Sequence, residues 1–475
     1  MVEKSVIMKK ATFTLLSVFI LSLLLPAALA AQKKDQDDPF KRDPIFSQSL
    51  DELFGTSDEK EEVSEGEDDE LRRAITTLSQ NGVDLGGNIE AGPYYSNSLY
   101  SLYPNLPTIH FNRVNGLFLG YRKERMQWHR QGDFLDIPQI QLHGHIGWGT
   151  ASKRWEYAVG LEKLIGRSDR FMIGAEYHNA LGTRDFTRVG LVESSLTSFF
   201  ASYDFPDYYI MEGFGAYAVF RTNRWLEAAF SYNSDQYSSV ERNTVWSLFG
   251  KDSVYRLNPP IDQNADEIDL DIYGLSLSLN PRNVLISNRF TAAGSVRLEL
   301  ADNAESDAGY RYNKYEAETR LYYNFEPGSV FKWRLSAGSI TGNAPDFNDF
   351  FLGGIGTLRG TPYKFYKGNQ MIMSNMEVQF GRPSRRSGEW FKDYNLHVLL
   401  FLDSGWIQQS EKLLNSTNPL EGFGRFRFSD LQHDAGVGVG SGVFRFELAW
   451  PLNSLGDQDA GFDSPTLWVR LNPTF

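Results

Sequence analysis

The sequence ends in Leu467-Trp468-Val469-Arg470-Leu471-Asn472-Pro473-Thr474-Phe475, and this stretch decides the fold class. Successive side chains of a β-strand point to opposite faces. One face of this stretch is therefore apolar and consists of Leu467, Val469, Leu471, Pro473 and Phe475. Bacterial outer-membrane barrels typically end in such a strand, and the terminal phenylalanine is part of the signal that their assembly machinery reads. The C-terminus therefore indicates a strand of a membrane barrel.

The same alternation repeats from about residue 82 to the end of the chain, for example in 139–146, 155–161 and 171–177. Charged residues stand in the middle of these segments: Glu156, Glu162, Glu176, Glu316, Glu318 and Arg320. A lysine or arginine facing lipid at the midplane costs about 2–4 kcal/mol and an acid costs less, so these side chains should face a polar interior. A soluble sandwich would show the same alternation, with the apolar face buried and the polar face in water. The two ends of the chain decide between a soluble sandwich and a membrane barrel.

The first thirty residues are predicted to be a signal peptide. Lys9 and Lys10 precede an apolar run from Ala11 to Leu25, and Ala28-Leu29-Ala30 is a small-x-small cleavage site. The alternative is a membrane anchor helix, for which the run is short. The sequence contains no cysteine, which excludes disulfides and thiolate metal sites and suits passage through an oxidising periplasm. We therefore expect the chain to reside in the bacterial cell outer membrane.

Residues 31–81 form an acidic segment, with a dense run of carboxylates from Asp58 to Glu70. Such a run repels itself and cannot build a core, so the segment is predicted to be a largely disordered periplasmic tail. A calcium site or a site for a basic partner is the alternative. The net charge of −13 argues against nucleic acid as a partner.

Residues 82–475 are predicted to form an all-β, transmembrane antiparallel β-barrel. Fifteen or sixteen strands can be drawn, and sixteen is preferred because bacterial single-chain barrels have an even number. The first, Val83–Tyr95, is the least regular. The alternation breaks at 184–208, where 193–203 could be a short helix, and at the long loops 243–266 and 410–429.

A glycine-rich stretch, Phe351-Leu352-Gly353-Gly354-Ile355-Gly356-Thr357-Leu358-Arg359-Gly360, resembles the inward-folded loop of the bacterial surface antigen family, the barrels related to BamA and TamA. The strand end Phe401-Leu402-Asp403-Ser404-Gly405 and the stretches Gly436–Gly440 and Phe444–Leu452 resemble the strands that follow this loop in the family. Five strands can be drawn after it, at 371–380, 395–405, 433–440, 443–452 and 467–475. Upstream, Phe111–Leu117 resembles an early strand of single-domain members.

The resemblance implies that an arginine holds the loop inside the barrel through lumenal acids. The loop motif comprises Gly353, Gly354, Leu358, Arg359 and Gly360, in which the glycines let the backbone turn and approach the wall. Alternation turns Glu377 and Asp403 inward on the next two strands. A guanidinium can hold a carboxylate through paired hydrogen bonds. Arg359 is therefore expected to contact Asp403, Glu377 or both, and a solvated surface arginine is the alternative.

The resemblance also implies a role in inserting or translocating proteins at the outer membrane. In the family the last strand closes weakly against the first, and Pro473 fits such a seam or marks only a frayed strand end. Members that assemble or secrete proteins usually carry periplasmic POTRA domains, for which 31–81 is too short and too acidic, and this departure counts against client capture by the chain alone. The expected partners are outer-membrane lipid, outer-membrane protein clients and periplasmic proteins.

Two other functions stay open at this point. One is a passive pore or a structural surface barrel. The other is an outer-membrane enzyme such as a lipid hydrolase. The sequence contains no Gly-x-Ser-x-Gly motif, so no enzyme and no catalytic residue is predicted. His143 and His145 share a strand face, but two histidines without a third ligand are more often part of a polar wall than a metal site. No metal or other cofactor is predicted.

Overall fold

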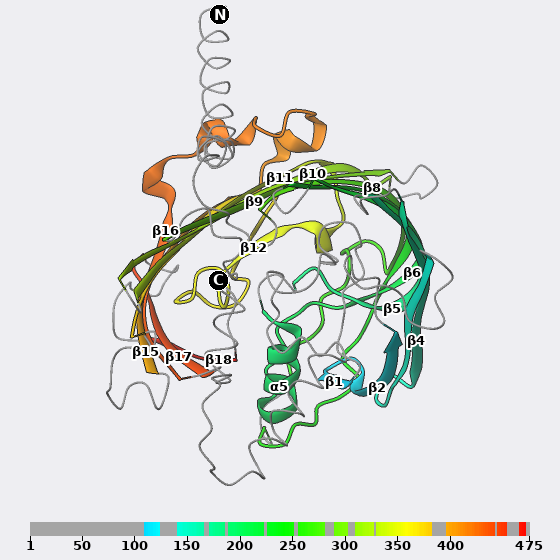
Figure 1. The fold of residues 1–475 in the computed structure, drawn as a ribbon, viewed down its shortest axis with the longest axis horizontal. Helices are drawn as coiled ribbons and strands as arrows, with labels where there is room; N and C mark the ends of the chain where they lie inside the picture. The colour runs from blue at the N-terminus through cyan, green and yellow to red at the C-terminus, as the bar shows by residue number, and fades with distance from the viewer. Residues whose placement is uncertain are drawn as a thin grey trace, which may run out of the picture.

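Sixteen antiparallel strands form one sheet that curves round into a barrel wall (Figure 1). The computed structural model describes residues 109–123, 140–165, 171–185, 189–222, 226–250, 255–280, 289–302, 309–326, 329–381, 396–441, 444–453 and 465–471. Neighbouring strands follow the chain order from β1 to β18, while β12 and β13 leave the wall and pair with each other. This sheet confirms the predicted fold class and strand number.

The first half of the wall contains β1 (Ile109–Asn112), β2 (Gly116–Lys123), β3 (Ile140–Gly149), β4 (Arg154–Ile165), β5 (Phe171–Gly182), β6 (Tyr209–Thr222), β7 (Leu226–Ser239) and β8 (Glu267–Leu279). The second half contains β9 (Phe290–Asp302), β10 (Arg311–Glu326), β11 (Ser329–Asn343), β14 (Gln370–Phe380), β15 (Leu396–Gln408), β16 (Gln432–Ser441), β17 (Phe444–Pro451) and β18 (Thr466–Leu471). Five strands follow the glycine-rich loop, as predicted.

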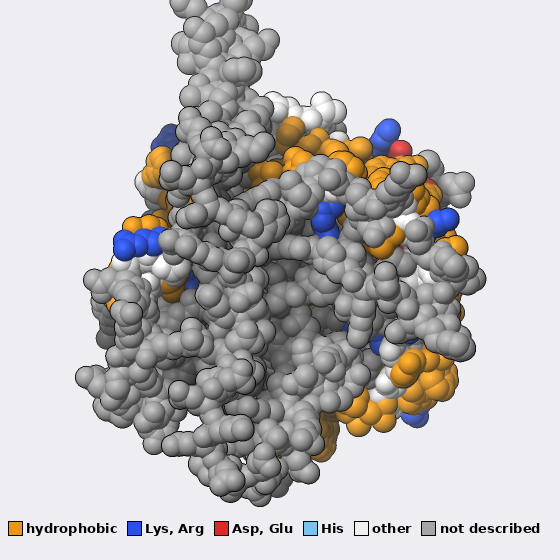
Figure 2. Space-filling view, viewed as in Figure 1, with side chains coloured by type: hydrophobic (Ala, Val, Ile, Leu, Met, Phe, Trp, Pro, Cys, Tyr) orange, Lys and Arg blue, Asp and Glu red, His pale blue; other side chains and the backbone are white. Residues whose placement is uncertain are grey.

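The wall buries its charged side chains and exposes its apolar ones. On β4, the odd-numbered Val159 and Leu161 are 52% and 54% exposed. The even-numbered Glu156 and Glu162 point inward and are 2% and 1% exposed. Figure 2 shows hydrophobic side chains along the outer rim of the molecule. A soluble sandwich would have the opposite arrangement. An apolar outer face with a polar interior is the arrangement of a membrane barrel.

A charge on this outer face should be strongly unfavourable. Leu161 lies near the middle of β4 and points outward. We expect Leu161→Arg to lower the free energy of unfolding from lipid vesicles by about 2–4 kcal/mol, because the guanidinium would face acyl chains. Urea titration followed by tryptophan fluorescence measures this change. The control, Leu414→Arg, is placed in the loop between β15 and β16 and should unfold like the parent, and equal losses for both variants would contradict a lipid-facing wall.

One sequence expectation is wrong and several cannot be compared with the structure. Phe111–Leu117 is not part of a single strand, because 113–115 form the turn between β1 and β2. The Asn112 side chain accepts hydrogen bonds from two backbone N–H groups of this turn, at 3.0 and 2.7 Å, and Gly116 adopts a φ of +63°. The expected signal peptide, the acidic segment, the strand at 83–95, Pro473 and Phe475 lie outside the described residues.

Two long loops lie against the strands of the barrel wall. The β11–β14 loop carries the hairpin of β12 (Phe350–Leu352) and β13 (Tyr366–Gly368) and lies within the barrel outline (Figure 1). The β5–β6 loop carries helix α5 (Leu191–Ala201), close to the predicted 193–203, which lies in the gap between β18 and β1 (Figure 1). Among the described residues, no helix has the length and hydropathy needed to cross a membrane.

Candidate functional site

The tip of the inward loop turns sharply at its glycines. Gly353, Gly354 and Gly356 have φ angles of +119°, +80° and +79°, a region that side chains disfavour. The N–H of Gly354 donates to the carbonyls of Leu358 and Thr361, at 2.7 and 2.9 Å, which closes the turn. Leu358 is fully buried. This turn delivers the neighbouring Arg359 to the barrel wall.

Arg359 is buried among three carboxylates of the wall. Its Nε and Nη2 donate to the two carboxylate oxygens of Asp403 on β15, at 2.7 and 2.8 Å. Its Nη1 donates to Glu377 on β14 at 2.7 Å and to Glu447 on β17 at 3.3 Å. The guanidinium also lies 3.5 Å from the ring centroid of Phe401. One side chain thus connects the loop tip to three of the five strands that follow it.

A second layer of polar groups completes this cluster. Arg445 of β17 donates to Glu377 at 2.6 Å and pairs with Glu447 on its own strand. The amide of Asn375 donates to Asp403 and to the backbone carbonyl of Thr357, both at 2.7 Å. The acids therefore have partners from the wall as well as from Arg359, which offsets part of their desolvation cost.

The backbone at and beside Arg359 is also hydrogen-bonded to the wall. Asp434 of β16 accepts from the N–H groups of Gly360 and Thr361, at 2.6 and 2.9 Å. The indole Nε1 of Trp468 on β18 donates to the carbonyl of Arg359 at 2.7 Å. The loop tip therefore contacts the last strand of the wall directly.

The structure brings Arg359, Glu377 and Asp403 together. Sequence reasoning missed Arg445, Glu447 and Asp434, although a signal existed for the first two. They alternate with outward-facing apolar residues in Phe444-Arg445-Phe446-Glu447-Leu448, so the parity used for β14 and β15 also turns them inward. Asp434 lies near the start of its strand, where alternation carries less information.

Gly360 has no room for a side chain. A Cβ atom there would lie 2.5 Å from the Trp450 carbonyl carbon and 2.6 Å from the Pro451 nitrogen, both backbone atoms of β17. We expect Gly360→Ala to destabilise the barrel by about 1–3 kcal/mol, because the loop must move away from the wall. The matched variant Gly424→Ala meets no atom within 4 Å and should be neutral. Equal urea midpoints for the two variants would contradict this close approach.

Helix α5 contacts both edge strands of the sheet. Its Glu193 accepts from Nε and Nη2 of Arg470 on β18, at 2.8 and 3.3 Å, and both side chains are buried. On the other side, the backbone N–H of Phe111 on β1 donates to Ser195 Oγ at 2.7 Å. Within the described residues, strand pairing runs from β1 to β18 without joining these two strands, and α5 contacts both of them.

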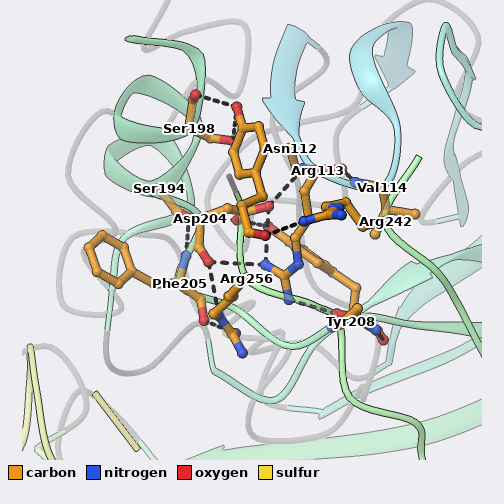
Figure 3. Close-up of polar contacts among 12 residues, drawn as sticks. Asn112, Arg113, Val114, Ser194, Ser198, Asp204, Phe205, Tyr208, Arg242 and Arg256 are labelled. Atoms are coloured by element: carbon orange, nitrogen blue, oxygen red, sulfur yellow. Dashed lines mark hydrogen bonds and ion pairs between the residues drawn. The ribbon is translucent and has the colours of Figure 1, made fainter. Parts of the chain in front are cut away.

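Arg113, in the turn after β1, fastens the chain that follows α5. Its backbone N–H donates to Asp204 Oδ2 at 2.7 Å, and its Nη1 lies 3.2 Å from the same oxygen. Its Nη2 donates to Asn258 of the β7–β8 loop at 2.7 Å. Figure 3 shows Arg113 within this network, which joins α5, the β1–β2 turn and the β7–β8 loop. Arg113 is fully buried, so its charge is balanced by these protein groups and not by water.

The inward loop and the α5 loop are also joined to each other. Lys364 forms ion pairs with Asp185 and Asp207, which flank α5 in the β5–β6 loop. Phe205 packs against Tyr363 of the inward loop and Trp468 of β18, with ring centroids 5.5 and 6.0 Å away. The Arg359 site and the gap between β18 and β1 therefore belong to one packed unit.

The two histidines named from the sequence occupy the inner face of β3. His143 is buried, with its Nε2 3.8 Å from a carboxylate oxygen of Glu162. Across the described part of the chain, no three His, Cys, Asp or Glu side chains are grouped as a metal ion would require.

Comparisons with known proteins give similarity at the level of structure. No protein-family model and no curated protein sequence matches the chain. A BamA structure from Haemophilus ducreyi lacking POTRA domains 1-3 is 12% identical, with a TM-score of 0.45 over 76% of this chain and 67% of that chain. CdiB from Escherichia coli is 13% identical, with a TM-score of 0.39 over 70% of this chain and 56% of that chain. CdiB from Acinetobacter baumannii is 11% identical, with a TM-score of 0.36 over 70% and 53%.

Proposed function

We propose that this chain is an outer-membrane barrel of the bacterial surface antigen type and that it aids the insertion or translocation of proteins at the outer membrane. The observation that carries the proposal is the buried cluster around Arg359. The ordered motifs after residue 350 resemble those of the family, and in this chain they supply the arginine, two of its acids and the glycines that its turn needs.

The neighbourhood of the cluster supports this role. The loop tip contacts β18 through Trp468, and β18 contacts α5 through Arg470. A rearrangement of the loop would therefore act on the edge of the sheet, where a passing strand or lipid could enter between β18 and β1. A passive pore has no need for a buried charged cluster that links its loop to this edge.

The partners of such a function are client proteins and, for client capture, periplasmic proteins. Client strands would present unpaired backbone groups, which an open sheet edge can hydrogen-bond. Co-purification from native membranes would identify the client or periplasmic partner.

Depletion of the protein tests the proposal. We expect the surface amounts of particular outer-membrane proteins to fall, as measured by quantitative mass spectrometry of surface-labelled cells. The parent gene should restore these amounts, and Arg359→Ala should restore them poorly at equal barrel abundance. Arg427→Ala changes an exposed arginine and serves as the matched control. Unchanged surface amounts after depletion would remove the function. A large, steady bilayer conductance that Arg359→Ala leaves unaltered would support the passive pore instead.

A further inference from the structure

Helix α5 has its polar side buried and its apolar side exposed. Ser194, Ser198 and Ser202 recur every four residues and are 2%, 0% and 8% exposed. On another side of the helix, Leu196 and Phe200 are 38% and 41% exposed. Residues four apart lie on the same side of a helix, and a helix on the surface of a soluble protein turns its apolar side inward. The reversed arrangement indicates an apolar environment outside α5.

The chain around α5 satisfies its buried polar side. Ser194 Oγ donates to Asp204 Oδ1 at 3.2 Å, and the carbonyl of Ser198 accepts from the Tyr255 hydroxyl at 2.5 Å. The hydroxyls of Ser202 and Ser247 lie 2.7 Å apart. Protein thus covers the serine side, whereas Leu196 and Phe200 on the apolar side remain exposed.

Segment 245–249 of the β7–β8 loop extends this aromatic side. The N–H groups of Leu248 and Phe249 donate to the carbonyls of Phe199 and Phe200, at 2.8 and 2.9 Å. Trp246 and Phe249 are 50% and 76% exposed. We call the resulting group the seam aromatic cluster, and it consists of Phe111, Phe199, Phe200, Trp246 and Phe249.

The strand register places this cluster on the outer face of the wall. Ile109 pairs with Leu119, and these two side chains point outward with 64% and 49% exposure. Phe111 is two residues further along the same strand and therefore shares their face. Phe111 is only 6% exposed, because the rings of Phe199 and Trp246 cover it at centroid distances of 5.6 and 5.7 Å. The aromatic end of α5 therefore lies against the outside of β1.

The opposite end of α5 lies on the inner side of the wall. Glu193 binds Arg470, whose buried side chain alternates on β18 with Leu467 and Val469, which are 59% and 48% exposed. The helix thus passes through the gap between β18 and β1, from a buried ion pair to an exposed aromatic surface. The apolar outer face of β1 adjoins that surface.

We propose that α5 and segment 245–249 form a lipid-contacting part of the wall between β18 and β1, so that membrane lipid covers the seam aromatic cluster. Continuity with the apolar outer face of β1 favours lipid over a second protein as the occupant. The aromatic composition fits as well, because tryptophan and other aromatics favour the membrane–water boundary, and the Trp148–Trp155 pair lies on the same outer face. This inference does not depend on the function proposed above.

Single-cysteine variants can test the inference, because the sequence contains no cysteine. Phe249→Cys and, as a second variant, Phe200→Cys would each carry a bimane label, in phosphatidylcholine vesicles with or without brominated acyl chains. Leu161→Cys on the wall is the lipid-exposed control. Phe428→Cys, in the β15–β16 loop at an 82% exposed position, is the water-exposed control.

We expect brominated lipid to quench the label at 249 at least about half as strongly as the label at 161. This is the quenching expected if residue 249 lies at the boundary between the lipid headgroups and the acyl chains. The label at 428 should change little. Quenching at 249 and 200 no stronger than at 428 would overturn the proposal. In that case, iodide quenching would indicate water as the occupant, whereas protection from both quenchers would indicate a second copy or another protein.

Discussion

Replacing Arg359 with alanine should destabilise the barrel by about 3–5 kcal/mol, because breaking a buried ion pair from one side leaves uncompensated charge. The guanidinium meets Asp403, Glu377 and Glu447, whose side chains are at most 2% exposed. The loss would be measured as the free energy of unfolding in urea from lipid vesicles. Cleavage of the folded protein within 344–369 should accelerate in parallel, since the loop tip loses its side-chain anchor.

Two further variants separate the charge from the geometry of this anchor. Arg359→Lys keeps the charge but loses the paired hydrogen bonds to Asp403, so its stability should lie between the parent and Arg359→Ala. Adding Asp403→Asn to Arg359→Ala removes one uncompensated charge and should recover part of the loss. A loss below about 0.5 kcal/mol for Arg359→Ala, as expected for an exposed arginine, would show that the cluster does not hold the loop.

Arg113→Ala should have an effect of similar size, about 3–5 kcal/mol, at the opposite edge of the sheet. The substitution leaves Asp204 buried without its charged partner and removes the side-chain bond to Asn258. The chain after α5 would then lose its main attachment to the β1–β2 turn. Hydrogen exchange measured by mass spectrometry should rise in 191–208 before it rises in the strands.

An exposed arginine provides the control for this variant. The Arg311 side chain is 80% exposed, and its removal should change stability by less than about 0.5 kcal/mol. If Arg113→Ala and Arg311→Ala had equal stability and equal exchange in α5, the Arg113 network would not be what fastens the helix.

The wall could be predicted from the sequence because alternation acts locally. On a strand, the parity of a residue number determines the side on which its side chain lies, so Glu377 and Asp403 could be turned inward without any tertiary information. The same pattern left fifteen or sixteen strands, and the even number typical of bacterial barrels favoured sixteen. The glycine-rich turn was recognisable because a backbone with positive φ demands particular residues.

The contacts at the gap between β18 and β1 could not be predicted, because they join residues that are far apart in the sequence. Glu193 and Arg470 are 277 positions apart, and Arg113 and Asn258 are 145 apart. No periodicity relates such positions. The sequence indicated a short helix here. The exposure of its apolar side, however, can be interpreted as lipid contact only once Phe111 is known to lie on the outer face of β1.

The position of Arg359 in the chain also sets an order of assembly. Its acids and the indole that binds its carbonyl lie on β14, β15, β17 and β18, all of which come later in the sequence. A chain that lacks the final strands keeps Glu377 and Asp403 but loses the contacts of the loop tip to Glu447, Asp434 and Trp468. The full set of loop-tip contacts can therefore form only after the last strand of the wall is in place, so docking of this loop is expected to be a late step of folding.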